Sequence, residues 1–269
     1  MSEPDGGEPV GLLGRQTPAR DILETQIEEG LHEINRELDG LFLSGLSAGL
    51  DIGFGPLLMA VVLTLSAGSY GDLPTELLLA SAYSIGFIFV VLGRSELFTE
   101  HTTLAVLPVI DGQASFTELG RLWAVILVSN VLGGLVFTAF VVNVIPSIGV
   151  ARPESFITVA EKLIHHGNWG MFLSAILAGW LMGLLSWLVT AAQSTTSRLL
   201  IIWLVTAAIG LLHLPHSIAG NVEVLFGLFL GPEITVADYA RFLVLATAGN
   251  AVGGSVFVAL LKYGHVTRA

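Results

Sequence analysis

Long apolar segments, separated by short polar connections, fill most of the chain. Segments long enough to cross a bilayer as a helix cover residues 41–65, 119–142, 169–192 and 238–261. Two further apolar runs begin near residues 76 and 198, and polar residues interrupt both of them. The pattern predicts an all-α membrane protein with six transmembrane helices, of which the second and the fifth are broken at mid-membrane.

The second interruption lies within residues 211–231, LLHLPHSIAGNVEVLFGLFLG. A polar group at bilayer depth costs on the order of 2.5–3.5 kcal/mol on insertion scales, so such groups are kept where they face protein or a water-filled path. Pro215 lacks a backbone donor and Gly220 loosens the helix, which favours a break. Transporters build ion sites from broken helices of this kind. The polar residues and helix breakers of this run are His213, Pro215, His216, Ser217, Gly220, Asn221 and Glu223.

The first interruption, within VLGRSELFTEHTT at residues 91–103, has the same character. We expect a break at residues 93–98, followed by a half-span to residue 110. Charged groups at this depth are usually paired. Arg94 is therefore expected to form an ion pair with Glu96 or Glu100, and these three residues to stabilise the break. A direct contact between Arg94 and an anion is the alternative.

The two halves of the chain share a pattern. The third span contains Asn130 three residues before a Gly-Gly pair and six before Val136-Phe137. The sixth span contains Asn250 in the same relation to Gly-Gly and to Val256-Phe257. Halves of three spans each insert in opposite orientations, so the pattern predicts an inverted 3+3 repeat whose breaks meet near the midplane.

The two ends of the chain lie outside the apolar segments. Residues 1–20 are rich in Gly, Pro and acidic residues and predict a disordered tail. Residues 21–40 predict a cytoplasmic amphipathic helix, because apolar residues from Leu23 to Leu38 fall on one stripe. The six-helix domain then takes residues 41–261, and residues 262–269 form a cytoplasmic tail. The distribution of Lys and Arg favours both termini inside the cell. The membrane we expect is the inner (plasma) membrane.

Composition excludes several functions. The chain is 53% hydrophobic with a mean hydropathy of +0.79. It has no cysteine, which excludes disulfides and thiolate metal sites. Its 11 Lys and Arg residues are not clustered, so we expect no nucleic-acid partner. Residues 45–49 match G-x-S-x-G, but that motif needs a strand-turn-helix context, so we expect helix packing and not an enzyme. His165 and His166 point apart on a helix, so no metal site and no cofactor are expected.

Three motifs together resemble those of the formate/nitrite transporter family. They are Glu96-Leu97-Phe98-Thr99 at the first break, His216-Ser217-Ile218-Ala219 at the second, and Gly249-Asn250 with Gly253-Gly254 in the last span. The resemblance covers residues 41–261. It implies an aquaporin-like protomer, assembled as a homopentamer in the lipid bilayer, with one pore in each protomer. The departures from the family pattern, at Arg94, Glu100, Pro215 and Glu223, are similar to its YfdC-like branch.

The resemblance and the chemistry of the breaks assign candidate pore residues. A small anion cannot pass an apolar constriction as a charge without a large desolvation cost. His216, beside Thr99 and Asn250, is expected to protonate or polarise the anion, since histidine titrates near physiological pH. A buried histidine that only bonds its neighbours is the alternative. The other candidates are Ser217 and Asn221 in the pore, Leu97, Phe98, Phe87, Met182 and Ile209 at apolar constrictions, and Lys162 in a vestibule. His213 has either a structural or a vestibular role.

The function expected is passive or proton-coupled transport of a small monovalent anion or weak acid of the formate or nitrite type. Each constriction residue also has a plain helix-packing interpretation, and Lys162 that of a solvated loop lysine. A pore for neutral solutes and a non-conducting structural or sensory membrane protein are the other functions left open.

Overall fold

The computed structural model describes residues 17–66 and 71–268, and within these ranges every regular element is a helix. Most of the expected tail at residues 1–20 lies outside the described residues. The first half contains α1 (Ala19–Asn35), α2 (Leu38–Asp51), α3 (Phe54–Ser66), α4 (Asp72–Gly93), α5 (Phe98–Leu104), α6 (Val106–Ile110) and α7 (Phe116–Ile148). The second contains α8 (Pro153–Ile164), α9 (Asn168–Ala191), α10 (Thr195–Leu211), α11 (Ser217–Leu230), α12 (Val236–Gly254), a π-helix (Ser255–Leu260) and α13 (Leu261–Thr267).

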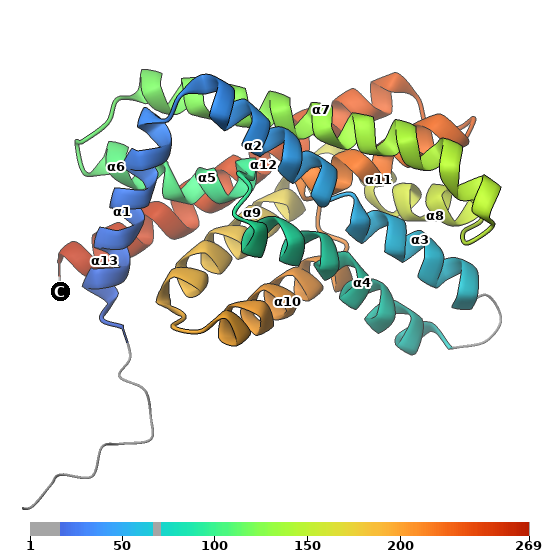
Figure 1. The fold of residues 1–269 in the computed structure, drawn as a ribbon, viewed down its shortest axis with the longest axis horizontal. Helices are drawn as coiled ribbons and strands as arrows, with labels where there is room; N and C mark the ends of the chain where they lie inside the picture. The colour runs from blue at the N-terminus through green and yellow to red at the C-terminus, as the bar shows by residue number, and fades with distance from the viewer. Residues whose placement is uncertain (1–16, 67–70, 269) are drawn as a thin grey trace, which may run out of the picture.

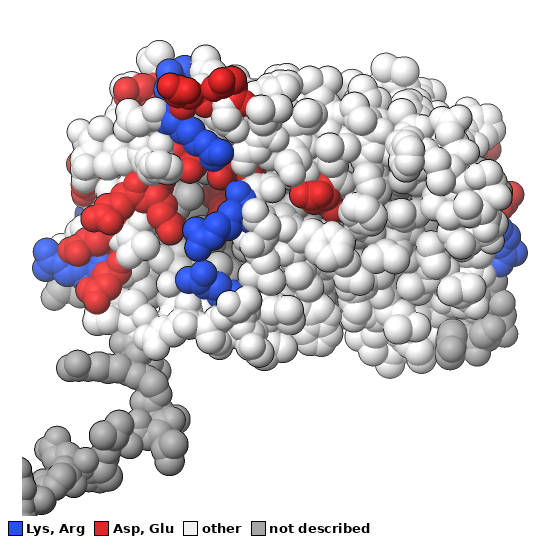
Figure 2. Space-filling model, in the orientation of Figure 1, with Lys and Arg blue, Asp and Glu red and all other residues white. Residues whose placement is uncertain are grey.

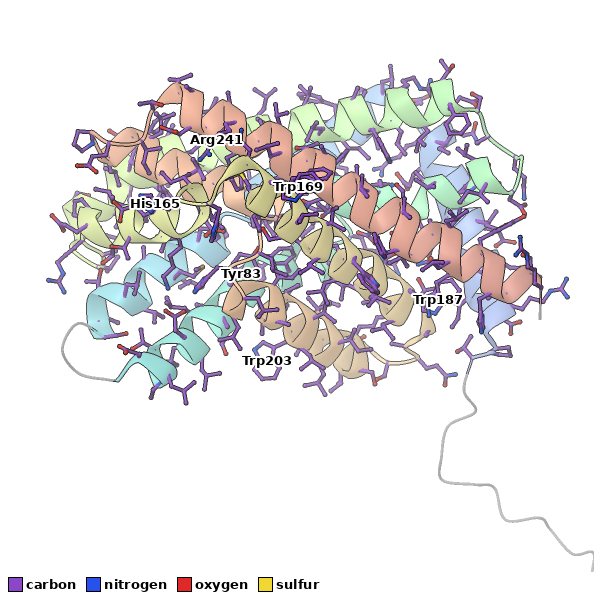
Figure 3. The ribbon with its side chains drawn as sticks, turned by 180° about the vertical axis from the view of Figure 1, so that it is seen from behind. Tyr83, His165, Trp169, Trp187, Trp203 and Arg241 are labelled. Carbon is purple, nitrogen blue, oxygen red and sulfur yellow. The ribbon has the colours of Figure 1, made fainter. Side chains whose placement is uncertain are left out.

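Length and apolar composition allow five helical segments of the described chain to cross a membrane. They are Leu38–Ser66, Asp72–Gly93, Phe116–Ile145, Asn168–Ala191 and Val236–Thr267, and α10 and α11 are shorter apolar helices. Charged side chains gather at the end of the molecule that carries α1, and a nearly uncharged surface separates them from a few at the opposite edge (Figure 2). Trp169 and Trp203 are exposed on the side seen from behind (Figure 3). An uncharged surface with exposed tryptophans is suited to contact with lipid.

The two halves of the chain form an inverted repeat. Helix α2 packs on α7 as α9 packs on α12, and the half-helices α4 and α10 lie side by side (Figure 1). Helices α7 and α12 begin with the same capping box, formed by Ser115 with Glu118 and by Thr235 with Asp238. The shared start and the shared partners confirm that the second half of the chain repeats the arrangement of the first.

Small residues set how closely the paired helices approach. A Cβ at Gly49 of α2 would meet the backbone oxygen of Asn130, and one at Gly179 of α9 would meet that of Asn250. At the neighbouring contact, the small and the larger residue change helices between the two halves. In the first half Gly45 faces Ser129, whereas in the second half Ala175 faces Gly249. Each pair therefore keeps one glycine and fills the same space from the opposite helix.

Helix α1 is amphipathic and packs across the end of the bundle beside α6, α9 and α13 (Figure 1). Ile22, Leu23, Ile27 and Ile34 are buried on one side. The helix ends at Asn35, earlier than expected, and Leu38 begins α2 with 47% of its surface exposed. At the other end of the chain the last helix continues to Thr267, so most of the expected tail is helical.

Candidate transport pore

The same turn ends the first half of each broken helix. Helix α4 ends at Gly93, Arg94 takes a left-handed conformation (φ 56°), and Ser95 N–H donates to Val90 O at 3.1 Å. Helix α10 ends at Leu211, His213 is left-handed (φ 48°), and Leu214 N–H donates to Ile209 O at 3.1 Å. These are the only two residues other than glycine with positive φ in the described chain. The repeat thus makes Arg94 and His213 equivalent.

Asn250 of α12 holds the second break in place. Its Oδ1 accepts from Ser217 N–H at 2.7 Å, and its Nδ2 donates to Ala175 O at 2.8 Å and to Pro215 O at 2.9 Å. The side chain is fully buried, so it satisfies backbone groups that the break leaves without helical partners. Asn250 thus lies beside His216, and both of its polar side-chain atoms are engaged in this clamp.

Asn130 of α7 makes the equivalent clamp at the first break. Its Oδ1 accepts from Phe98 N–H at 2.9 Å, and its Nδ2 donates to Gly45 O at 2.8 Å and to Glu96 O at 2.9 Å. The repeated Asn with Gly-Gly makes Asn130 the counterpart of Asn250, although the three family motifs do not include it. One amide from each half therefore positions the break of its own half.

His216 and Thr99 join the two breaks at the centre of the molecule. His216 Nε2 lies 2.8 Å from Thr99 Oγ1, and its Nδ1 accepts from the N–H groups of Ile218 (3.3 Å) and Ala219 (3.1 Å), which caps α11. Because Nδ1 is an acceptor in both bonds, the proton of the neutral ring lies on Nε2 and is donated to Thr99. The edge-on ring of Phe87, with ring centroids 4.9 Å apart, packs against the imidazole.

The two other pore candidates differ in position. Ser217 is fully buried beside His216, and its Oγ bonds to no other described group, which leaves a free hydroxyl at the break. Asn221 instead lies among α7, α11 and α12, where its Oδ1 accepts from Tyr239 OH at 2.7 Å and its Nδ2 approaches Val131 O. The structure does not bring Asn221 to the centre, because one further turn of α11 carries it to a helix-packing face.

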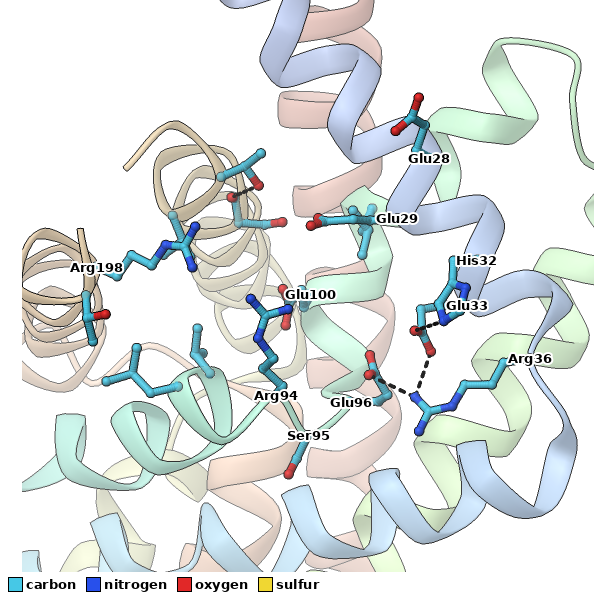
Figure 4. A pocket seen from close by; sticks show the side chains of 17 residues that line it. Glu28, Glu29, His32, Glu33, Arg36, Arg94, Ser95, Glu96, Glu100 and Arg198 are labelled. Carbon is cyan, nitrogen blue, oxygen red and sulfur yellow. Dashed lines mark hydrogen bonds and ion pairs between the residues drawn. The ribbon is translucent and has the colours of Figure 1, made fainter. Parts of the chain in front are cut away.

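A large cavity opens beside α1 and reaches the first break (Figure 4). We call it the α1-side cavity; its volume is about 830 Å³. Arg94, Glu29 and Glu100 point into it. Burial raises the pKa of Glu29 above its usual value, against the opposing effect of Arg94 and Arg198. A separate cavity of about 10 Å³ lies beside it, with Glu100, Met182 and Leu185 in its lining. The charged lining residues are Glu28, Glu29, Glu33, Arg36, Arg94, Glu96, Glu100 and Arg198.

A much smaller cavity lies on the other side of the centre, beside α8. This α8-side cavity is about 10 Å³ in volume, and its lining includes Tyr83, Lys162, Ile209, His213 and Glu223. All five predicted constriction residues are buried. Met182 borders the small cavity beside the α1-side cavity, Ile209 borders the α8-side cavity, and Phe87, Leu97 and Phe98 border none of these cavities.

The ion pair expected at the first break has different partners. Glu96 is 3.2 Å from Arg36 Nη1 and 2.6 Å from His101 Nε2. Arg94 forms no ion pair with any described carboxylate, because its left-handed turn directs it into the α1-side cavity. Nor is Glu100 found in an ion pair within the described ranges. Sequence spacing did not indicate Arg36, which approaches Glu96 only because the link between α1 and α2 crosses the break.

Lys162 is paired at the α8-side cavity. Its Nζ donates to Glu76 Oε1 at 2.6 Å and lies 3.4 Å from His213 Nε2. The interpretation of Lys162 as a solvated loop lysine is therefore wrong. Among the described residues no group of three or more His, Asp or Glu side chains is placed to hold a metal ion.

Two broken apolar helices that meet at one buried polar pair, between a cavity on either side, define a membrane transport protein. The sequence matches the family model described as formate/nitrite transporter over residues 20–264. It is 30% identical to the inner membrane protein YfdC of Escherichia coli (strain K12), over 98% of this chain and 84% of that protein. It is 27% identical to the formate channel FocA of Haemophilus influenzae, over 82% of this chain and 84% of that one.

Solved structures show the same fold. A pentameric formate channel with formate bound superposes with a TM-score of 0.76 at 25% identity, over 86% of this chain and 98% of that one. An FNT family ion channel superposes with a TM-score of 0.78 at 21% identity, over 91% and 99% of the two chains. The chain belongs to the formate/nitrite transporter family. This family consists of channels and transporters, not of enzymes.

Proposed function

We propose that this protein carries a small monovalent anion of the formate or nitrite class, or its weak acid, through a pore within each protomer. The observation that supports this most is the hydrogen bond between His216 and Thr99, which joins the two breaks between the α1-side and α8-side cavities. The names of its relatives, formate channel FocA and nitrite transporter NirC, supply the substrate class.

The bonds at the breaks favour a neutral histidine that polarises the anion over one that is already charged. A proton on Nδ1 would displace the two backbone donors that this atom accepts and would weaken the cap of α11. In the neutral ring, Nε2–H donates to Thr99, whose own hydroxyl proton is left to face the anion. Ser217 Oγ offers a second free donor. A weak acid takes its proton from water in a cavity, so transport follows the protonated fraction of the substrate.

Backbone groups contribute less to this site than broken helices suggest. The N–H groups of Phe98 and Ser217 are used by the two Asn clamps, and those of Ile218 and Ala219 by His216. A passing anion therefore meets side-chain hydroxyl groups in place of free backbone dipoles. Buried Leu97 and Phe87 exclude water around the polar pair, which strengthens each hydrogen bond to the substrate.

The arrangement in the membrane completes the proposal. Four crossings are continuous. One is formed by α2 together with α3, one by α7, one by α9, and one by α12 together with the π-helix and α13. Helix α4 with α5 and α6, and α10 with α11, form the two broken crossings, which gives six in all. The tail at residues 1–20, the helix at residues 21–40 and the end at residues 262–269 face the cytoplasm, so the α1-side cavity is the inner one. The chain assembles as a homopentamer in the inner membrane, as the superposed formate channel is a pentamer.

Uptake into proteoliposomes tests the proposal. Formate, nitrite and a permanently neutral solute are supplied at two external pH values to the wild type, to His216→Asn and to His265→Asn, a change at an exposed residue of α13 that lines neither cavity. We expect flux of formate or nitrite that rises at low pH, falls about tenfold in His216→Asn through loss of a buried donor, and is unchanged in His265→Asn. Flux of the neutral solute alone supports the neutral pore, and no flux of any solute supports a non-conducting role; either result refutes the proposal.

A further inference from the structure

The mouth of the α8-side cavity holds a carboxylate between two basic side chains. Glu76, in the first turns of α4, places Oε1 2.6 Å from Lys162 Nζ and Oε2 3.3 Å from His213 Nε2. The two basic groups are themselves 3.4 Å apart. Both oxygens of one carboxylate thus face one base each, which is the arrangement in which a small planar oxyanion is bound.

The hold on Glu76 is incomplete. Its Oε2 is shielded from solvent, yet it forms no hydrogen bond, because the contact with His213 is close in distance but unfavourable in geometry. The side chains of Glu76, Lys162 and His213 remain 32%, 26% and 30% exposed. An anion that arrives at this mouth can therefore reach all three groups, and it exchanges with a carboxylate that has only one good bond to lose.

The inverted repeat shows what is particular about this mouth. His213 and Arg94 are equivalent residues, each carried by the left-handed turn of its break and each lining the cavity of its own side. Arg94 stands over a cavity of about 830 Å³ without an ion pair in the described chain. His213 stands over a cavity of about 10 Å³, room for a single water, and a carboxylate of the protein lies against it.

Other charged groups do not replace Glu76 in this contact. Glu223 of α11 lines the same cavity, but it is buried and no ion pair of the described residues joins it to Lys162. Tyr83 of α4 also lines the cavity and is uncharged. Among the described residues, Glu76 is therefore the acidic group that forms an ion pair with Lys162.

We propose that Lys162 and His213 form an anion subsite at the α8-side mouth of the pore, and that the Glu76 carboxylate occupies it as a built-in competitor. The ligand class is a small monovalent carboxylate or an oxyanion of similar shape, and the inference rests on the proposed transport function. A substrate anion enters by displacing Glu76 from the subsite. If the subsite is open about one-tenth of the time, its apparent affinity for the anion is about tenfold weaker than the intrinsic one.

Kinetics and binding of the full-length protein test this subsite. In proteoliposomes, Glu76→Gln is expected to lower the half-saturating formate concentration about tenfold, because the amide no longer competes for Lys162. Glu154→Gln, at an exposed residue of the neighbouring helix α8, is the matched control and should leave it unchanged. Adding Lys162→Ala to Glu76→Gln should abolish the gain. Glu76→Asp, whose shorter side chain reaches less far, should give an intermediate value and guards against misfolding of the amide variant.

A second measurement separates this inference from the proposed function. The rise in melting temperature that sodium formate produces in detergent solution reports binding without transport. We expect a larger rise for Glu76→Gln than for the wild type, and none once Lys162→Ala is added. If the wild type transports no formate, the proposed function fails, but the rise in melting temperature still shows whether the subsite binds formate. Equal half-saturation and equal formate-dependent shifts in wild type and Glu76→Gln would overturn the subsite.

Discussion

Replacing Asn250 by alanine should destabilise the protein through the second break alone. The change removes three buried hydrogen bonds and leaves Ser217 N–H and Pro215 O without any other partner in the described chain. Side-chain hydrogen bonds inside a membrane protein average about 0.6 kcal/mol each, so three contribute about 2 kcal/mol. Two orphaned backbone groups at about 1–3 kcal/mol each give an upper value of about 6 kcal/mol.

The assay is the thermal unfolding of detergent-solubilised protein, followed by tryptophan fluorescence. A loss of about 2–6 kcal/mol corresponds to a fall in melting temperature of about 5–20 °C for a domain of this size. Asn130→Ala breaks the same three bonds at the first break and should fall by a similar amount. Asn250→Asp should be at least as harmful as alanine, because a carboxylate accepts from Ser217 but repels the two carbonyl oxygens.

Asn143→Ala is the matched control. Asn143 lies on α7, as Asn130 does, but it bonds only to Ala139 O at the exposed surface. Its melting temperature should stay near that of the wild type. The reasoning is refuted if Asn250→Ala or Asn130→Ala melts within about 2 °C of this control, a difference of less than about 1 kcal/mol. A large effect of one clamp and none of the other would show that the two breaks do not depend on equivalent clamps.

Two further perturbations test packing and charge. Gly49→Ala and Gly179→Ala should each cost about 1–3 kcal/mol, because their methyl groups would meet the backbone oxygens of Asn130 and Asn250, whereas Gly120→Ala, with open space around it, should be neutral or slightly stabilising in the same thermal assay. Burial raises the folded-state pKa of Glu29, so between the unfolded value of 4.5 and the folded value the folded state binds more protons, and stability falls as pH rises through that window. Melting curves against pH should flatten there in Glu29→Gln, and parallel curves for variant and wild type would contradict this.

Much of the fold follows from hydropathy and local breakers. Residues 91–103 and 211–231 interrupt apolar runs with polar groups, and the structure has breaks at residues 94–97 and 212–216. The repeated Asn with Gly-Gly indicated the inverted organisation, because the same close approach and the same clamp are needed twice. The π-helix in the last span was not predicted, since no distinct composition marks it.

The site was harder to predict, because contacts over long separations decide it. Thr99 and His216 were assigned together on family motifs, and 117 residues separate the two atoms that bond. The partners of Glu96 and Lys162 were missed for the same reason: Arg36 and Glu76 approach them from distant helices. Asn221 is four residues from Ser217 and on the same face of α11, yet the rise of one helical turn carries its side chain away from the break, where it accepts from Tyr239. Residue type alone does not specify such directions.

The repeat also explains why the pore has a single polar level. Equivalent positions at the two breaks carry different side chains. Leu97 in the first half corresponds to His216 in the second, and Thr99 corresponds to Ile218. Both halves hold their breaks with the same amide clamp, yet each contributes only one member of the polar pair. A perfectly repeated sequence would give two histidines or none at the midplane. The polar pair therefore depends on divergence between the halves at these positions, while the clamps and glycine contacts that place it stay the same.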